Sequence, residues 1–342
     1  MSIEIYTPNL SNRHELTHAI SLQTEVHYND TGKITLTVSA TDENIKNIVV
    51  GALYYDTDTG DTFIFRDVEI DSPNNEITAN GYTADSLVNK RVISNSPEVT
   101  LVERDIYQLI EDNLRGLTLN IAELKNLTAT TDVILHGGEI LDEIIPILNE
   151  AGYGYRMIWD PEELEFTFEI YEGTDLTTGM HAVIFSEEDG TATGLEISND
   201  ESTFKNVAYV VGEYNDTEVV KIVGTATGDE RFEVWKDAAG VTPEDGETQA
   251  AYENRLIIYG AQELSNHVKR TSFSVSIDAS ELGTIYHLGD LVSCVSQKYG
   301  MVFDARITGV KHTLDAKKET FSLVLGEPKL TLIGEMKLRW QR

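Results

Sequence analysis

The sequence is poor in cysteine and has no long apolar segment. One cysteine, Cys294, occurs among the 342 residues, and it falls inside a predicted strand. A single cysteine cannot form a disulfide within the chain, so we expect a buried thiol and folding in a reducing cytoplasm. No segment approaches the roughly 18 consecutive apolar residues of a membrane span. The start of the chain also lacks the charged and apolar regions of a secretory signal, and we expect no membrane insertion.

Basic side chains are scarce as well. The chain has 26 Lys and Arg against 58 Asp and Glu, which gives a formal net charge of -32. Such a chain repels phosphate backbones and anionic membranes, because sequence-independent binding to nucleic acid depends on basic side chains that neutralise phosphates. We therefore expect no stable nucleic-acid binding, and solubility alone could explain the charge. The end of the chain, with Lys329, Lys337, Arg339 and Arg342, is basic against this background and suits an acidic partner.

The pattern His14-Glu15-x-x-His18 matches the H-E-x-x-H zinc motif. On a helix the two histidines would share one face and bind zinc, with Glu15 as the general base. The metzincin extension is missing, because Ser21 and Thr24 occupy its positions. The flanking sequence also suits a strand, which would send alternate side chains to opposite faces. A zinc metallopeptidase is therefore an alternative hypothesis, and we expect no metal at these residues.

Other patterns indicate no catalytic or binding residues. The acidic loop Asp56–Asp61 departs from the EF-hand pattern at Gly60 and Asp67, so we expect a solvated hairpin turn and not a calcium site. The segment His136–Glu139 lacks the Gly-Lys-Ser/Thr that would hold a phosphate, and we expect a loop before a helix. Cys294 has no basic motif nearby, and no G-x-S-x-G elbow occurs. We expect no enzyme, and no catalytic, cofactor-binding or metal residue.

The length predicts more than one domain, because a single hydrophobic core stops growing at roughly 250 to 300 residues. Strand periodicity dominates residues 1–98, helical patterns join strands over 99–184, and strands return over 185–342. We predict an N-terminal β domain, an α+β insertion domain and a second β domain. In the first domain, residues 34–38 alternate as a strand and residues 54–65 predict a hairpin.

Helical spacing predicts three helices. The apolar stripes of the first two are Val102, Ile106, Leu109 and Ile110, then Leu141, Ile144, Ile145 and Leu148. The second contains Pro146, which predicts a kink or an early turn. The third and longest spans about 243–269 within the second β domain. It has Thr242 as its expected N-cap and Pro243 at its first position.

Residues 286–326 predict a β meander. Leu288-Gly289-Asp290 is a turn that leads into a strand over Leu291–Ser296, and Tyr299-Gly300 is a second turn. Two further strands follow, separated by a polar turn at 315–318. Their inward residues by period-two alternation are Phe303, Ala305, Ile307, Phe321, Leu323 and Leu325.

This segment resembles the tail hub proteins of long-tailed bacteriophages and prophages, which are related to the baseplate hub of contractile tails. Those proteins carry a Leu-Gly-Asp before a hydrophobic strand, an aromatic-Gly turn and an Arg-Ile-Thr strand. Here these are Leu288-Gly289-Asp290, Tyr299-Gly300 and Arg306-Ile307-Thr308. Similar segments follow the same order along almost the whole chain: Tyr28-Asn29-Asp30-Thr31-Gly32, Gly81-Tyr82 to Arg91, Phe185-Ser186 and Asn206–Val210.

The resemblance implies an α+β fold that is mostly β, with two β-barrel-like hub domains that carry α+β and helical insertions. It implies a structural virion protein at the tail tip, assembled in the cytoplasm of the bacterial host. Such proteins form a trimeric ring that joins the tail tube to the host-facing tip and gates DNA exit. The implied partners are two further copies of the chain, the distal tail protein, the tape measure protein and a tail fibre or receptor-binding protein. An acidic lumen would let DNA pass without adhering.

A carbohydrate-binding adhesin is a further alternative. Tyr153, Tyr155 and Trp159 lie close together in the sequence, and aromatic rings of this kind can stack on sugars. The same three residues suit a small hydrophobic core equally well.

Overall fold

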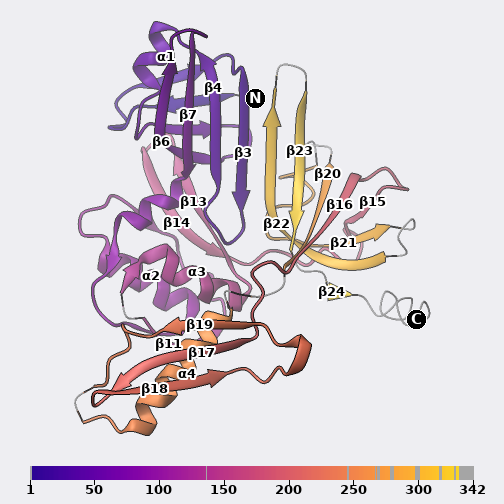
Figure 1. Cartoon of the computed structure of the whole chain (residues 1–342). Coiled ribbons are helices and arrows are strands. Elements are labelled where there is room, and N and C mark those ends of the chain that lie inside the picture. Colours follow the sequence, from indigo (N-terminus) through magenta and orange to yellow (C-terminus); the bar gives the residue numbers. More distant parts are fainter. Residues whose placement is uncertain are drawn as a thin grey trace. The chain divides into compact units, whose positions relative to one another are not determined.

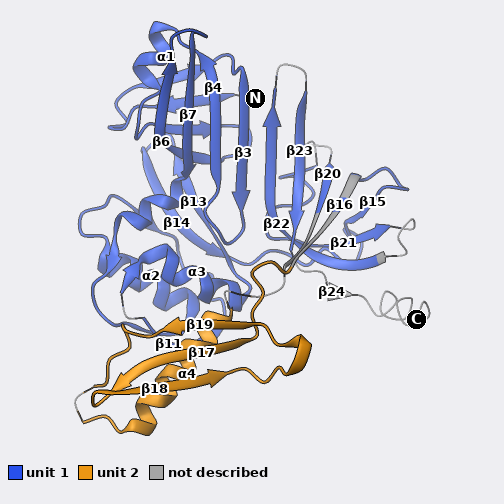
Figure 2. Ribbon diagram, in the orientation of Figure 1, with its two compact units in different colours: residues 1–196, 273–342 blue, residues 197–272 orange. Residues whose placement is uncertain are grey.

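A computed structural model describes residues 2–135, 137–244, 246–265, 267, 270–277, 281–296, 301–315, 318–326 and 329–330. The chain divides into two compact units (Figure 2). Unit 1 comprises residues 1–196 and 273–342, and unit 2 comprises residues 197–272. The predicted domain boundaries after residues 98 and 184 both fall within unit 1 and stay a prediction. None of the described helices is long and apolar enough to cross a membrane.

The N-terminal part of unit 1 is a β region (Figure 1). Its elements are β1 (Ile3–Tyr6), β2 (Arg13–Leu16), β3 (Ser21–His27), β4 (Lys33–Ser39), α1 (Asp42–Asn47), β5 (Leu53–Asp56), β6 (Thr62–Asp71), β7 (Glu76–Thr83) and the 3-10 helix η1 (Ala84–Lys90). The predicted alternation is confirmed in β4, where Ile34, Leu36 and Val38 are buried between exposed or half-buried neighbours. The predicted hairpin is confirmed as the antiparallel pair β5 and β6.

The middle of unit 1 packs two amphipathic helices with short strands and one long hairpin. Its elements are β8 (Val92–Ile93), β9 (Glu98–Leu101), α2 (Val102–Asn113), β10 (Asn120–Ile121), β11 (Thr130–Ile134), β12 (Gly138–Glu139), α3 (Ile140–Ala151), β13 (Gly154–Asp160) and β14 (Glu165–Tyr171). Helix α3 continues through Pro146 and ends at Ala151, and the positive φ of 74° at the following Gly152 lets Tyr153 N donate to Leu148 O. Both predicted apolar stripes lie in one hydrophobic core with the β13–β14 hairpin.

The C-terminal part of unit 1 is a second β region. Its elements are β15 (Ile184–Ser186), β16 (Thr193–Asp200), β20 (Arg270–Ile277), β21 (Leu291–Ser296), β22 (Met301–Leu314), β23 (Glu319–Leu325) and β24 (Lys329–Leu330). The predicted meander forms, but its middle strand pairs with its two meander neighbours along different parts of its length. Residues 301–306 of β22 pair with β21, and residues 307–314 pair with β23. A register shift between Ile307 and Gly309 marks a β-bulge where the partners change. The predicted turn at Tyr299-Gly300 lies outside the described residues.

Fourteen of the described strands join in one hydrogen-bonded sheet. The two β regions meet where residues 22–27 of β3 pair antiparallel with residues 309–314 of β22. Strands β2 and β16 end the main path of this sheet, and no pairing among the described strands joins those ends. The mostly β, α+β fold is confirmed, but the two expected β-barrel-like domains share one sheet, and no closed barrel is found among the described strands. Alternation specifies which residues face inward but not which strand lies alongside, and β22, with 14 residues, is long enough for two sets of partners.

Unit 2 is a three-stranded sheet with a helix on one face. Its elements are β17 (Val207–Tyr214), β18 (Thr217–Val223), the 3-10 helix η2 (Gly228–Glu230), β19 (Glu233–Asp237) and α4 (Gln249–Ser265). The strand order is β18-β17-β19, with β18 antiparallel and β19 parallel to β17. Tyr252 and Leu256 of α4 are fully buried in the core of this unit. The helix begins later than predicted, because Thr248 and not Thr242 accepts the N-terminal hydrogen bond, from Ala251 N at 3.3 Å.

Candidate functional site

The H-E-x-x-H residues lie on a strand and not on a helix. His14 and Glu15 are consecutive residues of β2, and His18 is an exposed residue beyond its end. Both ring nitrogens of His14 face α1, with Nε2 3.1 Å from Asn44 Oδ1 and Nδ1 3.1 Å from Glu43 Oε1. Among the described residues no group of three potential ligands could hold a metal ion. The metallopeptidase hypothesis requires a helix that presents both histidines on one face. It is wrong on this point, because His14 lies on a strand and His18 lies beyond the end of that strand.

The acidic loop between β5 and β6 is a hairpin turn, as predicted. Asp56 Oδ1 accepts hydrogen bonds from Asp58 N at 2.9 Å and Thr59 N at 3.4 Å, and Gly60 N donates to Asp56 O at 2.8 Å. Gly60 adopts φ of +82°, a conformation that favours glycine. The buried carboxylate of Asp56 thus accepts hydrogen bonds from the backbone of its own turn.

The aromatic cluster proposed for carbohydrate binding is core. Tyr153, Tyr155 and Trp159 are all buried. The Trp159 ring meets Tyr6 edge-on at 5.4 Å between centroids, and the Tyr155 ring stacks on Phe168 at 5.7 Å. These rings are enclosed by their own chain and are closed to a sugar, so the adhesin hypothesis fails for this cluster.

The predicted buried thiol is confirmed. Cys294 lies on β21 within the hydrophobic core of the second β region. Burial raises the pKa of its thiol to about 12, so the nucleophilic thiolate is strongly disfavoured at neutral pH. His136, the first residue of the glycine-rich segment considered above, lies outside the described residues.

The structure brings several of the motif residues together at one buried point, the Tyr28 junction, which we define as Tyr28, Tyr171, Gly173, Gly289 and Arg306. The Tyr28 side chain is fully buried. Its hydroxyl lies 3.1 Å from Gly152 O and 3.2 Å from Tyr171 O as the donor, and it accepts a hydrogen bond from Gly173 N at 3.1 Å. Burial raises the pKa of this hydroxyl, which therefore stays protonated.

The backbone and ring of Tyr28 complete the junction. Tyr28 N donates to Thr308 O at 3.0 Å, and Tyr28 O accepts from Tyr155 N at 3.0 Å. The Arg306 guanidinium lies 5.3 Å from the centroid of the Tyr28 ring, and the Tyr171 ring meets it edge-on at 5.2 Å. Tyr28 therefore joins the N-terminal β region, the middle region and the second β region.

The Leu-Gly-Asp motif closes the same junction. Gly289 adopts φ of +97°, and a Cβ atom there would lie 2.3 Å from Cε2 of Tyr28. Asp290 is buried and accepts hydrogen bonds from Thr174 N and His287 N, both at 2.8 Å. Arg306 donates to Gly289 O. These motif residues are thus structural, because they lock three segments together and leave no open face for a substrate.

A buried carboxyl lies beside the first motif. Asp85 of η1 is 4% exposed, and its Oδ2 accepts a hydrogen bond from Thr31 Oγ1 at 3.1 Å. Burial raises the pKa of Asp85 to about 6. The junction region of unit 1 therefore contains an acid that changes charge near neutral pH.

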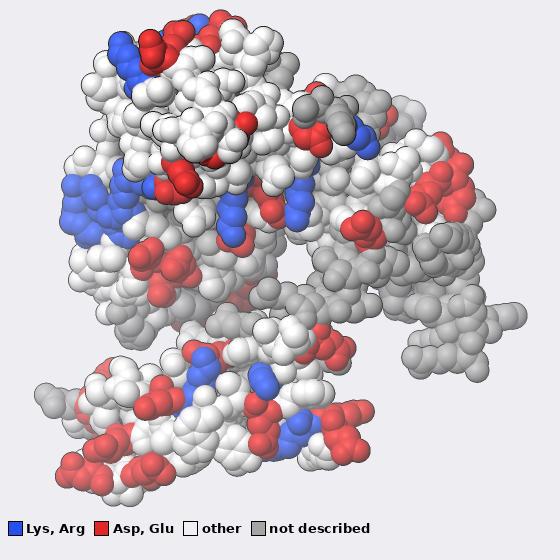
Figure 3. All heavy atoms as spheres, turned by 45° about the horizontal axis from the view of Figure 1, so that its top comes forward, with Lys and Arg blue, Asp and Glu red and all other residues white. Residues whose placement is uncertain are grey.

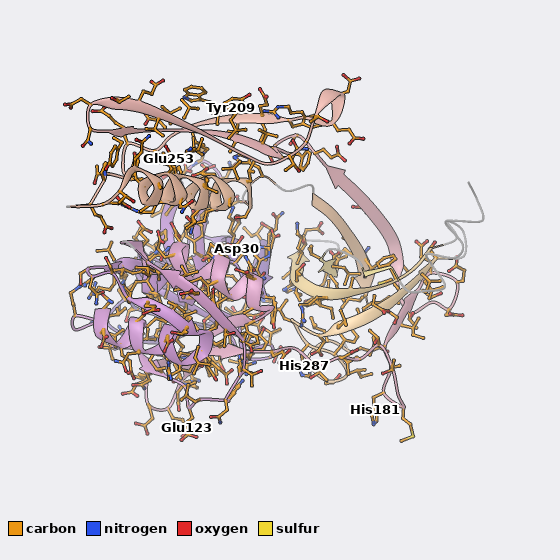
Figure 4. The ribbon with its side chains drawn as sticks, turned by 90° about the horizontal axis from the view of Figure 1, so that it is seen from below. Asp30, Glu123, His181, Tyr209, Glu253 and His287 are labelled. Carbon is orange, nitrogen blue, oxygen red and sulfur yellow. The ribbon has the colours of Figure 1, made fainter. Side chains whose placement is uncertain are left out.

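Unit 2 carries a surface that the sequence patterns above did not single out. We call it the outer face, the side of the sheet away from α4. Its exposed or half-buried apolar members are Tyr209, Val211, Val220, Ile222 and Trp235, whereas Val207 at the start of β17 is buried. In Figure 4 the strands with Tyr209 and the helix with Glu253 form two layers. Alternation in β17, β18 and β19 was the available signal, but alternation alone does not say which face a helix covers.

A family model described as Siphovirus ReqiPepy6 Gp37-like protein matches residues 2–327. A search among curated proteins found no match. Among the solved structures that are similar to nearly the whole chain are three tail proteins. A tail protein from Neisseria meningitidis MC58 has a TM-score of 0.57 and 12% identity, and the match covers 95% of this chain and 96% of that one. Prophage tail protein gp18 from Listeria monocytogenes EGD-e has a TM-score of 0.52 and 15% identity, with coverage of 100% and 99%.

The third is the 43 kDa tail protein of prophage MuSo2 from Shewanella oneidensis, with a TM-score of 0.56, 9% identity and coverage of 95% and 98%. At these identities the structures establish a shared fold. Together with the family match, they confirm the resemblance to phage and prophage tail proteins that the sequence motifs indicated. The chain belongs to the family of Siphovirus ReqiPepy6 Gp37-like proteins.

Proposed function

We propose that this protein is the structural hub of a phage or prophage tail tip. In this proposal three copies form a ring that joins the tail tube and distal tail protein to the host-facing tip and controls the exit of DNA. The observation that carries the proposal is the tail-protein fold over nearly the full length of the chain, in a chain whose family match spans residues 2–327. Its place would be the tip of the virion tail, after assembly in the host cytoplasm.

The internal construction of unit 1 suits a part that bears load. The two β regions share one sheet through β3 and β22, so force on one region is transmitted through backbone hydrogen bonds. The Tyr28 junction adds a buried cross-link among three segments. Each protomer would contribute its two β regions to a ring that presents a pseudo-sixfold face to the distal tail ring.

The charge of the chain supports a passage for DNA. Asp and Glu are spread over the visible faces of the units, and Lys and Arg gather in several groups, one of them broad at the left of the view (Figure 3). Three copies would carry a formal charge of three times -32, or -96. A lumen lined by carboxylates would repel the DNA backbone and keep it moving. A ring whose lumen is lined mostly by Lys and Arg would contradict this part of the proposal.

The ring is tested by the mass of the assembled protein in solution. We expect light scattering after gel filtration to give about three times the monomer mass of 38.1 kDa, alone or after mixing with the distal tail protein from the same phage. Three copies with the same strong negative charge repel each other more at low salt, so the measurement should span several ionic strengths. A monomer under all these conditions would contradict the trimeric hub.

Its place in the virion is tested separately. Antibodies to this chain should label the tail tip of intact particles, and particles assembled without the chain should lack a functional tip. The tape measure protein and a fibre or receptor-binding protein are expected to cross-link to it in the assembled tail. Label along the tail shaft, or on the capsid, would overturn the proposed position.

A further inference from the structure

We propose that the outer face of unit 2 docks a protein partner whose contact surface combines apolar side chains with Lys and Arg. This inference rests on the geometry and charge of unit 2 and goes beyond the proposed ring. The surface belongs to a sheet whose other face is already covered by α4, where Gly260 lies against Val210 and Val223. Within the described residues of unit 2 no element covers the outer face in the same way.

The strand register places the apolar residues of this face in two adjoining rows. Tyr209 on the central strand lies between Ile222 and Trp235, and Val211 lies beside Val220. Trp235 is 63% exposed, Ile222 is 54% exposed and Val220 is 40% exposed. Large apolar side chains at neighbouring positions of one sheet face make a continuous patch, which is typical of an interaction surface.

One of the two aromatic rings of this face, that of Tyr209, already has an arginine over it. The Arg231 guanidinium lies 5.7 Å from the centroid of the Tyr209 ring, and Nη2 donates to the Tyr209 hydroxyl at 3.0 Å. The Trp235 ring lies almost parallel to that of Tyr209, at 6.3 Å between centroids. Trp is the ring that attracts cations most strongly, so Trp235 can receive a partner's Lys or Arg as Tyr209 receives Arg231.

Apart from Arg231, which pairs with Glu233, the charged residues that the strand register places on this face are carboxylates. Glu213 and Glu218 lie directly opposite each other on β17 and β18, and both are exposed. Like charges in this cross-strand position destabilise a sheet. Asp237 of β19 lies on the same face, beside Val211. No ion pair among the described residues neutralises these three carboxylates.

The side of the sheet that α4 covers is built differently. There Lys221 pairs with Glu253, and Lys236 pairs with Glu263. Lysines of the sheet thus neutralise Glu253 and Glu263 of the helix, whereas Glu213, Glu218 and Asp237 of the outer face have no ion pair among the described residues. A partner with Lys or Arg around an apolar centre would supply the missing charge and bury the exposed rings, which is the complementarity that specific interfaces show.

A protein surface fits this face better than a sugar. Three of the five apolar members of the patch, Val211, Val220 and Ile222, are aliphatic, and aliphatic side chains do not form the flat stacking platform that a sugar ring uses. The Tyr209 ring is also covered on one side by Arg231. A carbohydrate is therefore kept as an outcome of the test.

The test uses the full chain and a short labelled peptide in which Arg alternates with Val and Leu. Fluorescence anisotropy would measure its binding beside a peptide with Glu in place of Arg, and beside chitohexaose and cellohexaose measured by calorimetry. We expect the Arg peptide to bind with Kd below about 1 mM and the Glu peptide not to bind. Trp235→Ala should weaken binding by about tenfold, as for an exposed aromatic anchor.

The matched control is Ile258→Ala, which removes an apolar side chain that is 59% exposed on α4. It should leave the Kd within about twofold, since it lies outside the outer face. A double variant, Glu213→Gln with Glu218→Gln, should reduce the salt dependence of binding and tests the charge without touching Trp235. Equal binding of both peptides, binding of the sugars alone, or equal effects of Trp235→Ala and Ile258→Ala would each overturn the proposal.

Discussion

Tyr28 in unit 1 and Tyr209 in unit 2 each contact an arginine side chain, but the two tyrosines differ in burial. Each ring has an arginine above it, Arg306 at 5.3 Å and Arg231 at 5.7 Å. Tyr28 is fully buried, with a hydroxyl that contacts three backbone groups, whereas Tyr209 is half-buried and its hydroxyl accepts from Arg231. A tyrosine–arginine pair thus connects segments of the core where the chain encloses it, and it forms part of the surface where the chain leaves it accessible.

The comparison predicts its largest effect for Tyr28→Ala. The change leaves a cavity in a packed core and removes a hydroxyl on which Gly173 N depends, so we expect the free energy of unfolding to fall by about 4 kcal/mol or more. Urea denaturation followed by circular dichroism would measure it. Tyr209→Ala is the matched control and should cost less than about 1 kcal/mol, because this side chain is only half-buried and its removal leaves no enclosed cavity. Equal losses would show that enclosure does not distinguish the two tyrosines.

The next effect is a dependence on pH that only a buried acid can give. The pKa of Asp85 is raised by burial to about 6, from an ordinary value of 3.8. Between these values the folded state holds a proton that the unfolded state has lost, so stability falls as the pH rises through this window. For a group this buried, the two-unit shift corresponds to about 3 kcal/mol.

Asp85→Asn keeps the size of the side chain and removes the charge. We expect the variant to gain about 3 kcal/mol relative to the natural chain as the pH rises from below 3.8 to above 6, with no further gain above that window. Urea denaturation across this pH range would measure the difference. A difference that does not change with pH would mean that the Asp85 carboxyl is solvated in the folded protein.

A smaller effect is expected for Gly289→Ala. Gly289 and the exposed Gly179 have similar φ angles, +97° and +92°, but only at Gly289 would a Cβ atom meet another group, the Tyr28 ring. Gly179→Ala therefore reports the backbone strain alone, and Gly289→Ala should cost about 1 to 3 kcal/mol more because of the clash. Adding Tyr28→Ala should remove most of that excess, since the ring is then gone. An excess that persists without the ring would place its cause elsewhere.

Local patterns were sufficient to predict individual elements. Strand β21 has the bounds predicted from the sequence, Leu291–Ser296, because the turn at Gly289-Asp290 and a clean alternation define both its start and its faces. The predicted start of α4 was wrong, and the reason lies in the local sequence. Thr242 and Thr248 both have N-cap chemistry, and Pro243 at the expected first helical position favoured Thr242, although Thr248 accepts the hydrogen bond in the structure.

Long-range relations were beyond local patterns. The pairing of β3 with β22 joins residues almost three hundred positions apart, and no periodicity encodes which strands become neighbours. Several motif residues of the Tyr28 junction were recognised one by one, but their convergence depends on that pairing and on Gly173, which no motif contained. Trp235 was missed because either face of an alternating strand can be the covered one.

The smallest effect on stability is expected for Trp235→Ala, and its smallness is what separates the outer face from the junction. Trp235 lies on an edge strand, is 63% exposed and contributes a ring pair with Tyr209, so its removal should change the free energy of unfolding by less than about 1 kcal/mol. Denaturation of the natural and variant chains under identical salt would measure the change. A loss like that of Tyr28→Ala would mean that Trp235 supports the fold of unit 2. A loss within the expected limit means that the exposed Trp235 ring contributes little to the stability of the fold. Its exposure is then best explained by a partner that covers it.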